Sequence, residues 1–157
     1  MTIRKADIND IPDIERLLRQ ICTVHAVGRP DLFKTNGQKY NAKQIKEIIE
    51  DESRPLFVAF DEDSQSVLGY AMCIVQKVEN NTALHDMKTL YLDDLCVDEN
   101  IRGQGIGKKL YEFLLDYAKE EDFYNLTLNV WESNSSAKKF YEKCGLSVQK
   151  TTLEKIL

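Results

Sequence analysis

The stretch that decides the fold is Arg102-Gly103-Gln104-Gly105-Ile106-Gly107-Lys108-Lys109. It follows an apolar, strand-like segment, and the residues after it carry apolar side chains at helical spacing. Alternating glycines let the main chain adopt positive φ and come close to a ligand. The unpaired amides of a first helical turn attract phosphate. The segment is therefore predicted to be a phosphate-binding turn between a strand and a helix.

Two common phosphate-binding motifs do not fit this turn. A P-loop requires G-x-x-x-x-G-K-[ST], but Arg102 stands five residues before Gly107, and Lys109 stands where Ser or Thr is needed. A dinucleotide-binding turn requires G-x-G-x-x-G, and its third glycine, counted from Gly103, would fall on Lys108. A nucleotide-binding module is therefore disfavoured. A glycine turn that serves only the chain geometry remains the plainer alternative.

The pattern on both sides of the turn predicts an α/β fold with a mixed sheet and the element order β-α-α-β-β-β-α-β-α-β. Apolar side chains at helical spacing predict four helices, with Asp10 expected to cap the first and Asn41 with Gln44 the second. A strand, a helix and a strand over residues 88–130 imply a parallel crossover, whereas residues 56–78 read as an antiparallel hairpin. Residues 23–40 lack periodicity and read as a long loop. Strands are expected over residues 3–6, 56–60, 67–78, 88–97, 126–130 and 146–153.

Composition limits the class of protein. The 157 residues, 43% hydrophobic and 30% charged, suit one globular domain with its own core. No apolar run reaches the roughly 20 residues that span a bilayer, and the N-terminus is polar too early for a secretory signal, so a cytoplasmic location is expected. The net charge of -5 does not favour nucleic acid. Four scattered cysteines without a CxxC pair and two isolated histidines predict no metal site.

Two segments resemble those of the GCN5-related N-acetyltransferases, the GNAT family. The family signature [Q/R]-x-x-G-x-[G/A] matches residues 102–107, and its second cofactor segment, N-x-x-A-x-x-F-Y-x-x-x-G-[FL], matches residues 134–146. The element order agrees from end to end, and the agreement is weakest over residues 23–39. The resemblance implies a GNAT-like fold whose central sheet is splayed to form an acetyl-CoA cleft. It also implies a single N-acetyltransferase domain over residues 1–157.

The resemblance assigns cofactor contacts to individual residues. The main chain of Leu95, Cys96 and Val97 is expected to pair with the pantetheine arm and to polarise the acetyl carbonyl, since developing oxyanion charge needs preorganised donors. Asn134 is expected to contact the pantetheine arm, and Ala137 leaves room beside it. The amides expected to hold the pyrophosphate are those of Arg102, Gly103, Gln104, Gly105, Ile106, Gly107 and Lys108.

Acetyl transfer to an amine needs one group that takes the amine proton and another that protonates the departing thiolate. The resemblance implies that Tyr141 is this acid, and the alternative is that Tyr141 is a core aromatic. Strand alternation is expected to place Asp93 and Asp94 on opposite faces, so that only one enters the cleft. Asp93 is preferred as the base. The alternatives for the base are Asp94, His25 and a water relay.

The predicted function is transfer of an acetyl group from acetyl-CoA, as co-substrate, directly to a primary amine within a ternary complex. The alternative is a non-catalytic CoA-binding or regulatory domain of the same fold. The acceptor is expected to be a small molecule or a peptide, near His25, Phe33 and Trp131, and the sequence does not identify it. No nucleic acid or membrane is expected as a partner. Members of the family often form dimers, and the last strand could pair with a partner, so a homodimer is also an expectation.

Overall fold

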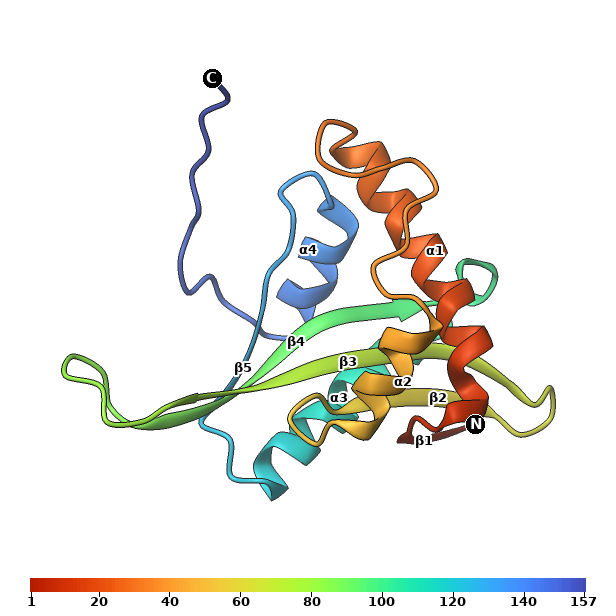
Figure 1. Ribbon diagram of the computed structural model, residues 1–157, viewed down its shortest axis with the longest axis horizontal. Coiled ribbons are helices and arrows are strands. Elements are labelled where there is room, and N and C mark those ends of the chain that lie inside the picture. Colours follow the sequence, from red (N-terminus) through yellow and green to blue (C-terminus); the bar gives the residue numbers. More distant parts are fainter.

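The computed structural model describes residues 1–157 and contains a five-stranded sheet with helices on both faces (Figure 1). The strands lie in the order β1-β2-β3-β4-β5, and all neighbours are antiparallel except β4 and β5, which are parallel. The predicted mixed sheet is therefore confirmed, with the crossover between β4 and β5. The strands are β1 (Thr2–Lys5), β2 (Leu56–Asp61), β3 (Ser66–Val78), β4 (Met87–Val97) and β5 (Asn125–Leu128).

Helices cover the two faces of the sheet, and each face has its own apolar core. On one face, α1 and α2 bury side chains such as Leu17 and Ile45 against Tyr70. On the other face, α3 buries side chains such as Leu110 against Phe57. None of the helices combines the length and the apolar character that a membrane crossing requires. The helices are α1 (Ile11–Gly28), α2 (Ala42–Glu50), α3 (Ile106–Glu120) and α4 (Ser135–Lys143), with short 3-10 turns at Ile8–Asp10 and Glu99–Ile101.

Local hydrogen bonds set the starts of the first two helices. Asn41 and Gln44 form the predicted capping box at α2. The expectation that the Asp10 side chain caps α1 is wrong, because it makes no cap hydrogen bond to that helix. Its carboxylate instead accepts from the amide of Asp7 at 2.8 Å and from the guanidinium of Arg4 at 2.7 and 2.9 Å. Asp10 is only 3% exposed, so this pairing satisfies a carboxylate that burial would otherwise penalise.

Two segments differ from the predicted elements. Helix α1 continues to Gly28, so the loop covers residues 29–41 and does not begin at residue 23. The last turns of α1 expose Val24 and Val27, so they need no apolar repeat.

The strand expected over residues 146–153 does not form. After the amide of Leu146, which donates to the carbonyl of Tyr141, no main-chain group of residues 147–157 has a backbone hydrogen-bond partner. A strand requires a neighbour, and this segment has none within the chain.

Gly69 of β3 lies in close contact with β4. A Cβ at this position would come within 2.7 Å of the carbonyl oxygen of Cys96. A backbone oxygen cannot rotate away, so Gly69→Ala should force the two strands apart. It is expected to lower the free energy of unfolding by about 1–3 kcal/mol, the usual cost of overpacking. Chemical denaturation measures this change.

The matched control for that variant is Gly28→Ala. Its Cβ would meet the hydroxyl of Ser133 at 2.6 Å, but that side chain can rotate to another rotamer. Gly28→Ala is therefore expected not to lower the free energy of unfolding. Equal stability of the Gly69→Ala variant and the wild type would contradict the close approach of β3 to β4.

Candidate functional site

The candidate site lies where β4 and β5 separate. The parallel register between the two strands ends at Leu92 and Leu128, whereas β4 continues to pair with β3 as far as Val97. The edge of β4 that faces β5 therefore has no strand partner over residues 93–97. Cys96 turns its thiol into the core, where it donates to the carbonyl of Leu17 at 3.5 Å. The main-chain groups along this edge of β4 are therefore free to contact a ligand.

The glycine turn before α3 is exposed, and its amides are unused. No main-chain amide over residues 102–108 donates a hydrogen bond within the chain. Gly103 and Gly105 have φ values of +84° and +80°, and a Cβ on either would meet nothing within 4 Å. The Nε of Arg102 donates to the carbonyl of Val97 at 3.2 Å, which ties the turn to the end of β4. A row of free amides at the positive end of a helix fits a diphosphate.

The second predicted segment, α4, lies beside this turn. A Cβ on Gly107 would come within 3.6 Å of both Phe140 of α4 and Val97 of β4, so the two helices and the strand meet there. Asn134 caps α4, because its Oδ1 accepts from the amide of Ala137 at 3.1 Å. Gly145, with φ of +88°, follows the helix in the left-handed conformation, as its position predicts. The sequence segment therefore folds as expected, although the first role of Asn134 is to start a helix.

Tyr141 of α4 packs against the core beneath α3 and is partly buried. Burial raises the pKa of its phenol, and the charge of Asp94 raises it further. The phenol therefore keeps its proton at neutral pH and can donate it.

A β-bulge brings both aspartates of β4 to the same face of the sheet. Asp94 lies opposite Met72 and Leu92 lies opposite Cys73, which leaves Asp93 as the extra residue of β4. The prediction that Asp93 and Asp94 face opposite sides is therefore wrong. Strict alternation fails at the bulge, and both carboxylates lie on the side of α1 and of the loop 29–41.

The carboxyl group of Asp94 accepts a hydrogen bond from a buried tyrosine, and its pKa is shifted. Its Oδ2 accepts from the hydroxyl of Tyr70, which is fully buried, at 2.8 Å. Burial raises the pKa of Asp94, while the charge of Lys39 and the Tyr70 hydrogen bond act in the opposite direction. The carboxyl group therefore binds a proton at a higher pH than an ordinary aspartate, as a proton-accepting group should.

Asp93 holds the loop 29–41 against the sheet. Its Oδ2 accepts from the hydroxyl of Tyr40 and pairs with the ammonium of Lys39, both at 3.0 Å. The hydroxyl of Tyr40 in turn accepts from Arg54 at 3.0 Å. Partial burial lowers the pKa of Lys39, but the charges of Asp94 and Asp93 outweigh it and the pKa is raised overall. Lys39 therefore remains a cation beside the two carboxyl groups.

The three residues expected near the acceptor come together in the structure. Phe33 stacks on His25 with ring centroids 5.1 Å apart and meets Trp131 edge-on at 5.5 Å. Burial lowers the pKa of His25, so its imidazole is neutral at pH 7. The guanidinium of Arg29 lies 5.9 Å from the Trp131 ring. Trp131 itself lies beyond the end of β5 and not within a strand. This aromatic row joins the end of α1 to the segment that follows β5.

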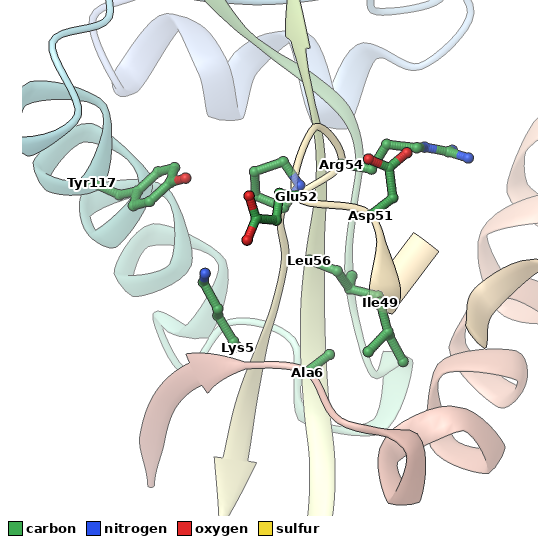
Figure 2. Close-up of a pocket in the computed structure, with 9 residues that line it drawn as sticks. Lys5, Ala6, Ile49, Asp51, Glu52, Arg54, Leu56 and Tyr117 are labelled. Atoms are coloured by element: carbon green, nitrogen blue, oxygen red, sulfur yellow. The ribbon is translucent and has the colours of Figure 1, made fainter. Parts of the chain in front are cut away.

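A small pocket elsewhere on the surface does not belong to this site. It lies between the end of β1, the end of α2 and α3, with Lys5, Glu52 and Tyr117 directed toward it (Figure 2). The guanidinium of Arg54 points away from it. Acidic and basic side chains both line it, and it contains none of the residues that the sequence predicts for the cofactor, the chemistry or the acceptor.

Sequence reasoning missed three side chains of the site, namely Tyr70, Lys39 and Tyr40. Tyr70 lies in the middle of an apolar strand, where nothing in the sequence distinguishes it from a core aromatic. Lys39 and Tyr40 precede the capping box of α2 and carry no motif. The one available signal was the pair of adjacent aspartates in an otherwise apolar strand. Buried carboxyl groups need partners, so that pair predicts hydroxyl and ammonium groups nearby.

Comparison with known proteins gives concordant results. The model of the acetyltransferase (GNAT) family matches residues 18–146. The peptidyl-lysine N-acetyltransferase YjaB of Salmonella typhimurium is 32% identical over 127 residues, which are 78% of this chain and 74% of that protein. The glucosamine 6-phosphate N-acetyltransferase of Arabidopsis thaliana is 38% identical over 68 residues, only 43% of this chain and 44% of the plant protein. A crystal structure of a mutant of the BH1408 protein from Bacillus halodurans has a TM-score of 0.95 and 31% identity, and covers 100% of this chain and 99% of that one.

Proposed function

Because the chain belongs to the acetyltransferase (GNAT) family and is an acetyl-transferring enzyme, we propose that it moves the acetyl group of acetyl-CoA directly to a primary amine in a ternary complex. The match to the family and to named N-acetyltransferases sets aside the alternative of a domain that binds CoA without catalysis. We take residues 1–157 as one domain with this activity.

The observation that carries the proposal is the row of unbonded amides over residues 102–108, next to the opening between β4 and β5. These amides would hold the diphosphate of CoA, because they combine free donors with the positive end of α3. The unpaired edge of β4 at Leu95, Cys96 and Val97 would bind the amide groups of the pantetheine arm. Asn134 and Ala137 would line the other side of that arm.

The thioester supplies an activated acetyl group and a thiol leaving group, and the chain supplies the proton transfers. Tyr141 would donate its phenolic proton to the departing thiolate, since its raised pKa keeps it protonated at neutral pH. Main-chain donors of β4 would orient the acetyl carbonyl and stabilise negative charge on its oxygen. The main chain of β4 would thus act on the acetyl carbonyl, and the side chain of Tyr141 on α4 would act on the leaving thiolate.

We propose Asp94, in preference to Asp93, as the group that takes the amine proton. The raised pKa of Asp94 suits a base, and its charge acts on both Tyr141 and His25. An amine would have to compete for Asp93 with Lys39 and Tyr40, which already bind it. Asp93 would therefore position the loop, and a water molecule could carry the proton to Asp94 where the amine does not reach it.

The acceptor would lie beside the aromatic row of His25, Phe33 and Trp131. These rings give an apolar wall, and the two carboxyl groups of β4 give a negative end that attracts an ammonium group. Such a site suits an amine on a small molecule or on a peptide. The related proteins are named for both kinds of acceptor, a peptidyl lysine and a sugar phosphate amine.

The proposal is tested by measuring the release of free CoA thiol from acetyl-CoA in the presence of an amine panel. The panel contains a lysine peptide, glucosamine 6-phosphate, a polyamine, an aminoglycoside and free amino acids. At least one amine is expected to raise thiol release far above the rate with acetyl-CoA alone, with an equal amount of N-acetylated product. Heat of acetyl-CoA binding without release for any amine would instead indicate binding alone.

A pair of glycine variants shows whether the turn before α3 is the binding element. Gly105→Val is expected to weaken acetyl-CoA binding at least about tenfold, because a side chain at positive φ costs about 1–2 kcal/mol and redirects the amides. Gly145→Val is the matched control, since Gly145 also has positive φ and open space around its Cα. It should lose similar stability but keep its affinity for acetyl-CoA. If the two variants bind acetyl-CoA with equal affinity, the turn before α3 is not the element that binds it.

A further inference from the structure

Lys39 places a primary amine of the chain beside the two carboxyl groups of β4. Its Nζ lies 3.0 Å from the Oδ2 of Asp93 and 3.4 Å from the main-chain carbonyl oxygen of the same residue. Partial burial lowers the pKa of Lys39, but the charges of Asp94 and Asp93 raise it overall, so both carboxyl groups act on this amine. Lys39 therefore lies at the negative end of the site, where the ammonium group of an acceptor is proposed to bind.

Other lysines that form ion pairs lie at the surface with exposed partners. Lys138 is the closest match, because its side chain is 33% exposed and that of Lys39 is 37% exposed. The partner of Lys138 is Glu132, which is 90% exposed, whereas Asp93 is only 13% exposed. Solvent screens a pair such as that of Lys138 and Glu132. The amine of Lys39 is distinguished by its shielded carboxyl neighbours, not by its own exposure.

The amine of Lys39 is also close to the edge of β4 that is proposed to hold the acetyl group. Pairing between β4 and β5 ends at Leu92, so Asp93 is the first residue of the unpaired edge. A strand rises about 3.3 Å per residue, so Leu95 lies roughly 7 Å beyond Asp93. The nitrogen of a lysine stands on a flexible stem of four carbons. Rotation of this side chain can therefore carry Nζ from Asp93 to an acetyl group bound at Leu95.

Lys39 is a poor target for acetylation without a catalyst. Only the neutral form of an amine attacks a thioester, and the raised pKa of Lys39 keeps it protonated at neutral pH. Lys43, whose side chain is 86% exposed, is far more accessible to acetyl-CoA in solution. Acetylation that selects Lys39 over Lys43 would therefore require a group in the site that takes the proton of Lys39.

We propose that the enzyme acetylates the Nζ of Lys39 in its own chain. The inference rests on the proposed function and uses the same proton acceptor and donor. The ammonium group gives one proton to Asp94, and its nitrogen then forms a bond to the acetyl carbon as the bond from that carbon to sulfur breaks. The departing thiolate takes the proton of Tyr141, and the second proton lost by the nitrogen returns through solvent to the phenolate.

The products of this reaction are Nε-acetyl-Lys39 and the CoA thiol, and one proton passes from Asp94 to solvent. The acetylated side chain has no charge, so its ion pair with Asp93 is lost. The hydrogen bond from Tyr40 to Asp93 does not involve Lys39 and can persist. The modification would thus remove one of the two contacts through which Asp93 holds the loop 29–41.

The test incubates the full chain with acetyl-CoA in a buffer free of amines. Peptide mass spectrometry follows acetylation of each lysine, and a thiol assay follows the release of CoA. Lys39 is expected to be acetylated at least about 100-fold faster than Lys138 or Lys43, within the range that a placed acid and base supply. Thiol release should stop once each chain has reacted. Transfer within one chain requires a rate constant that does not change with protein concentration.

Three controls separate this reaction from uncatalysed acetylation. Lys39→Arg keeps a positive charge beside Asp93 but lacks the amine, so the initial release of thiol should be absent. Tyr141→Phe should slow acetylation of Lys39 about 100-fold, as for a lost general acid, and leave Lys138 and Lys43 unaffected. The wild type unfolded in urea should lose its selectivity for Lys39.

The results that would overturn this inference differ from those that would overturn the proposed function. A wild type that acetylates an amine of the panel but leaves Lys39 unmodified would overturn this inference alone. Equal acetylation of Lys39 in the wild type and in Tyr141→Phe, or a rate constant that rises with protein concentration, would do the same. A wild type that acetylates neither Lys39 nor any added amine would count against both.

Discussion

Replacing Tyr141 by phenylalanine is expected to lower kcat about 100-fold or more, the range typical of a lost general acid, while acetyl-CoA binds with unchanged affinity. The substitution removes one hydroxyl and keeps the ring that packs against the core beneath α3. Burial raises the pKa of this phenol, so the proton that the leaving thiolate requires is present throughout the neutral range. Steady-state kinetics and calorimetry with acetyl-CoA separate the loss of chemistry from a loss of binding.

Two controls make this result specific to proton donation. Tyr117→Phe removes a hydroxyl from α3, next to the pocket in Figure 2 and outside the candidate site, and should leave kcat close to the wild-type value. An acetyl thioester with a more acidic thiol needs less help from an acid, so it should narrow the difference between the Tyr141→Phe variant and the wild type. A full rate for Tyr141→Phe with acetyl-CoA would exclude this residue from the chemistry and leave it a core aromatic.

The second large effect is expected for Asp94→Asn, which should lower kcat/KM about 100-fold at neutral pH, as expected for a lost general base. A base acts in its deprotonated form. Because burial raises the pKa of Asp94 above the ordinary value of about 3.9, wild-type activity should fall as the pH drops through that raised pKa. The asparagine variant has no such group, so its residual activity should lack this acidic limb. A pH profile of kcat/KM measures both.

Neighbouring variants decide which aspartate is responsible. Asp93→Asn should weaken the contact of β4 with Lys39 and Tyr40, raise KM for the acceptor and keep the acidic limb. Tyr70→Phe removes a hydrogen bond that stabilises the charged form of Asp94, so the limb should move to higher pH. Loss of the limb in Asp93→Asn, with its retention in Asp94→Asn, would assign the base to Asp93.

The sequence predicted the parts of the site that depend on local geometry. The glycine turn requires positive φ at the start of a helix, and Gly103 and Gly105 have it. The segment that begins at Asn134 and ends before Gly145 forms the expected helix. The mixed sheet followed from a strand, a helix and a strand in series. In each case neighbouring residues determine the structure, so the pattern is readable without knowledge of distant contacts.

The parts that the sequence did not predict depend on contacts between distant segments. The bulge at Asp93 arises from the register of β4 against β3, and no glycine marks it. The last turns of α1 have no apolar repeat because they extend past the core. The strand expected over residues 146–153 needs hydrogen-bond partners that the single chain does not offer. Periodicity reports the propensity of a segment but does not report whether a neighbour is present.

The extra residue in β4 also determines which changes of strand length evolution can make at this point. On one side of the bulge Leu92 packs beneath α3, and on the other side Cys96 packs beneath α1. Deleting one of the two aspartates would remove the bulge and restore regular alternation, so that Leu95 and Cys96 would stay in their present cores. Straightening the strand without a deletion would instead exchange Cys96 with Leu95 between the two cores. A descendant could therefore shorten the strand at this point with both cores intact, but it would lose one carboxyl group of the pair.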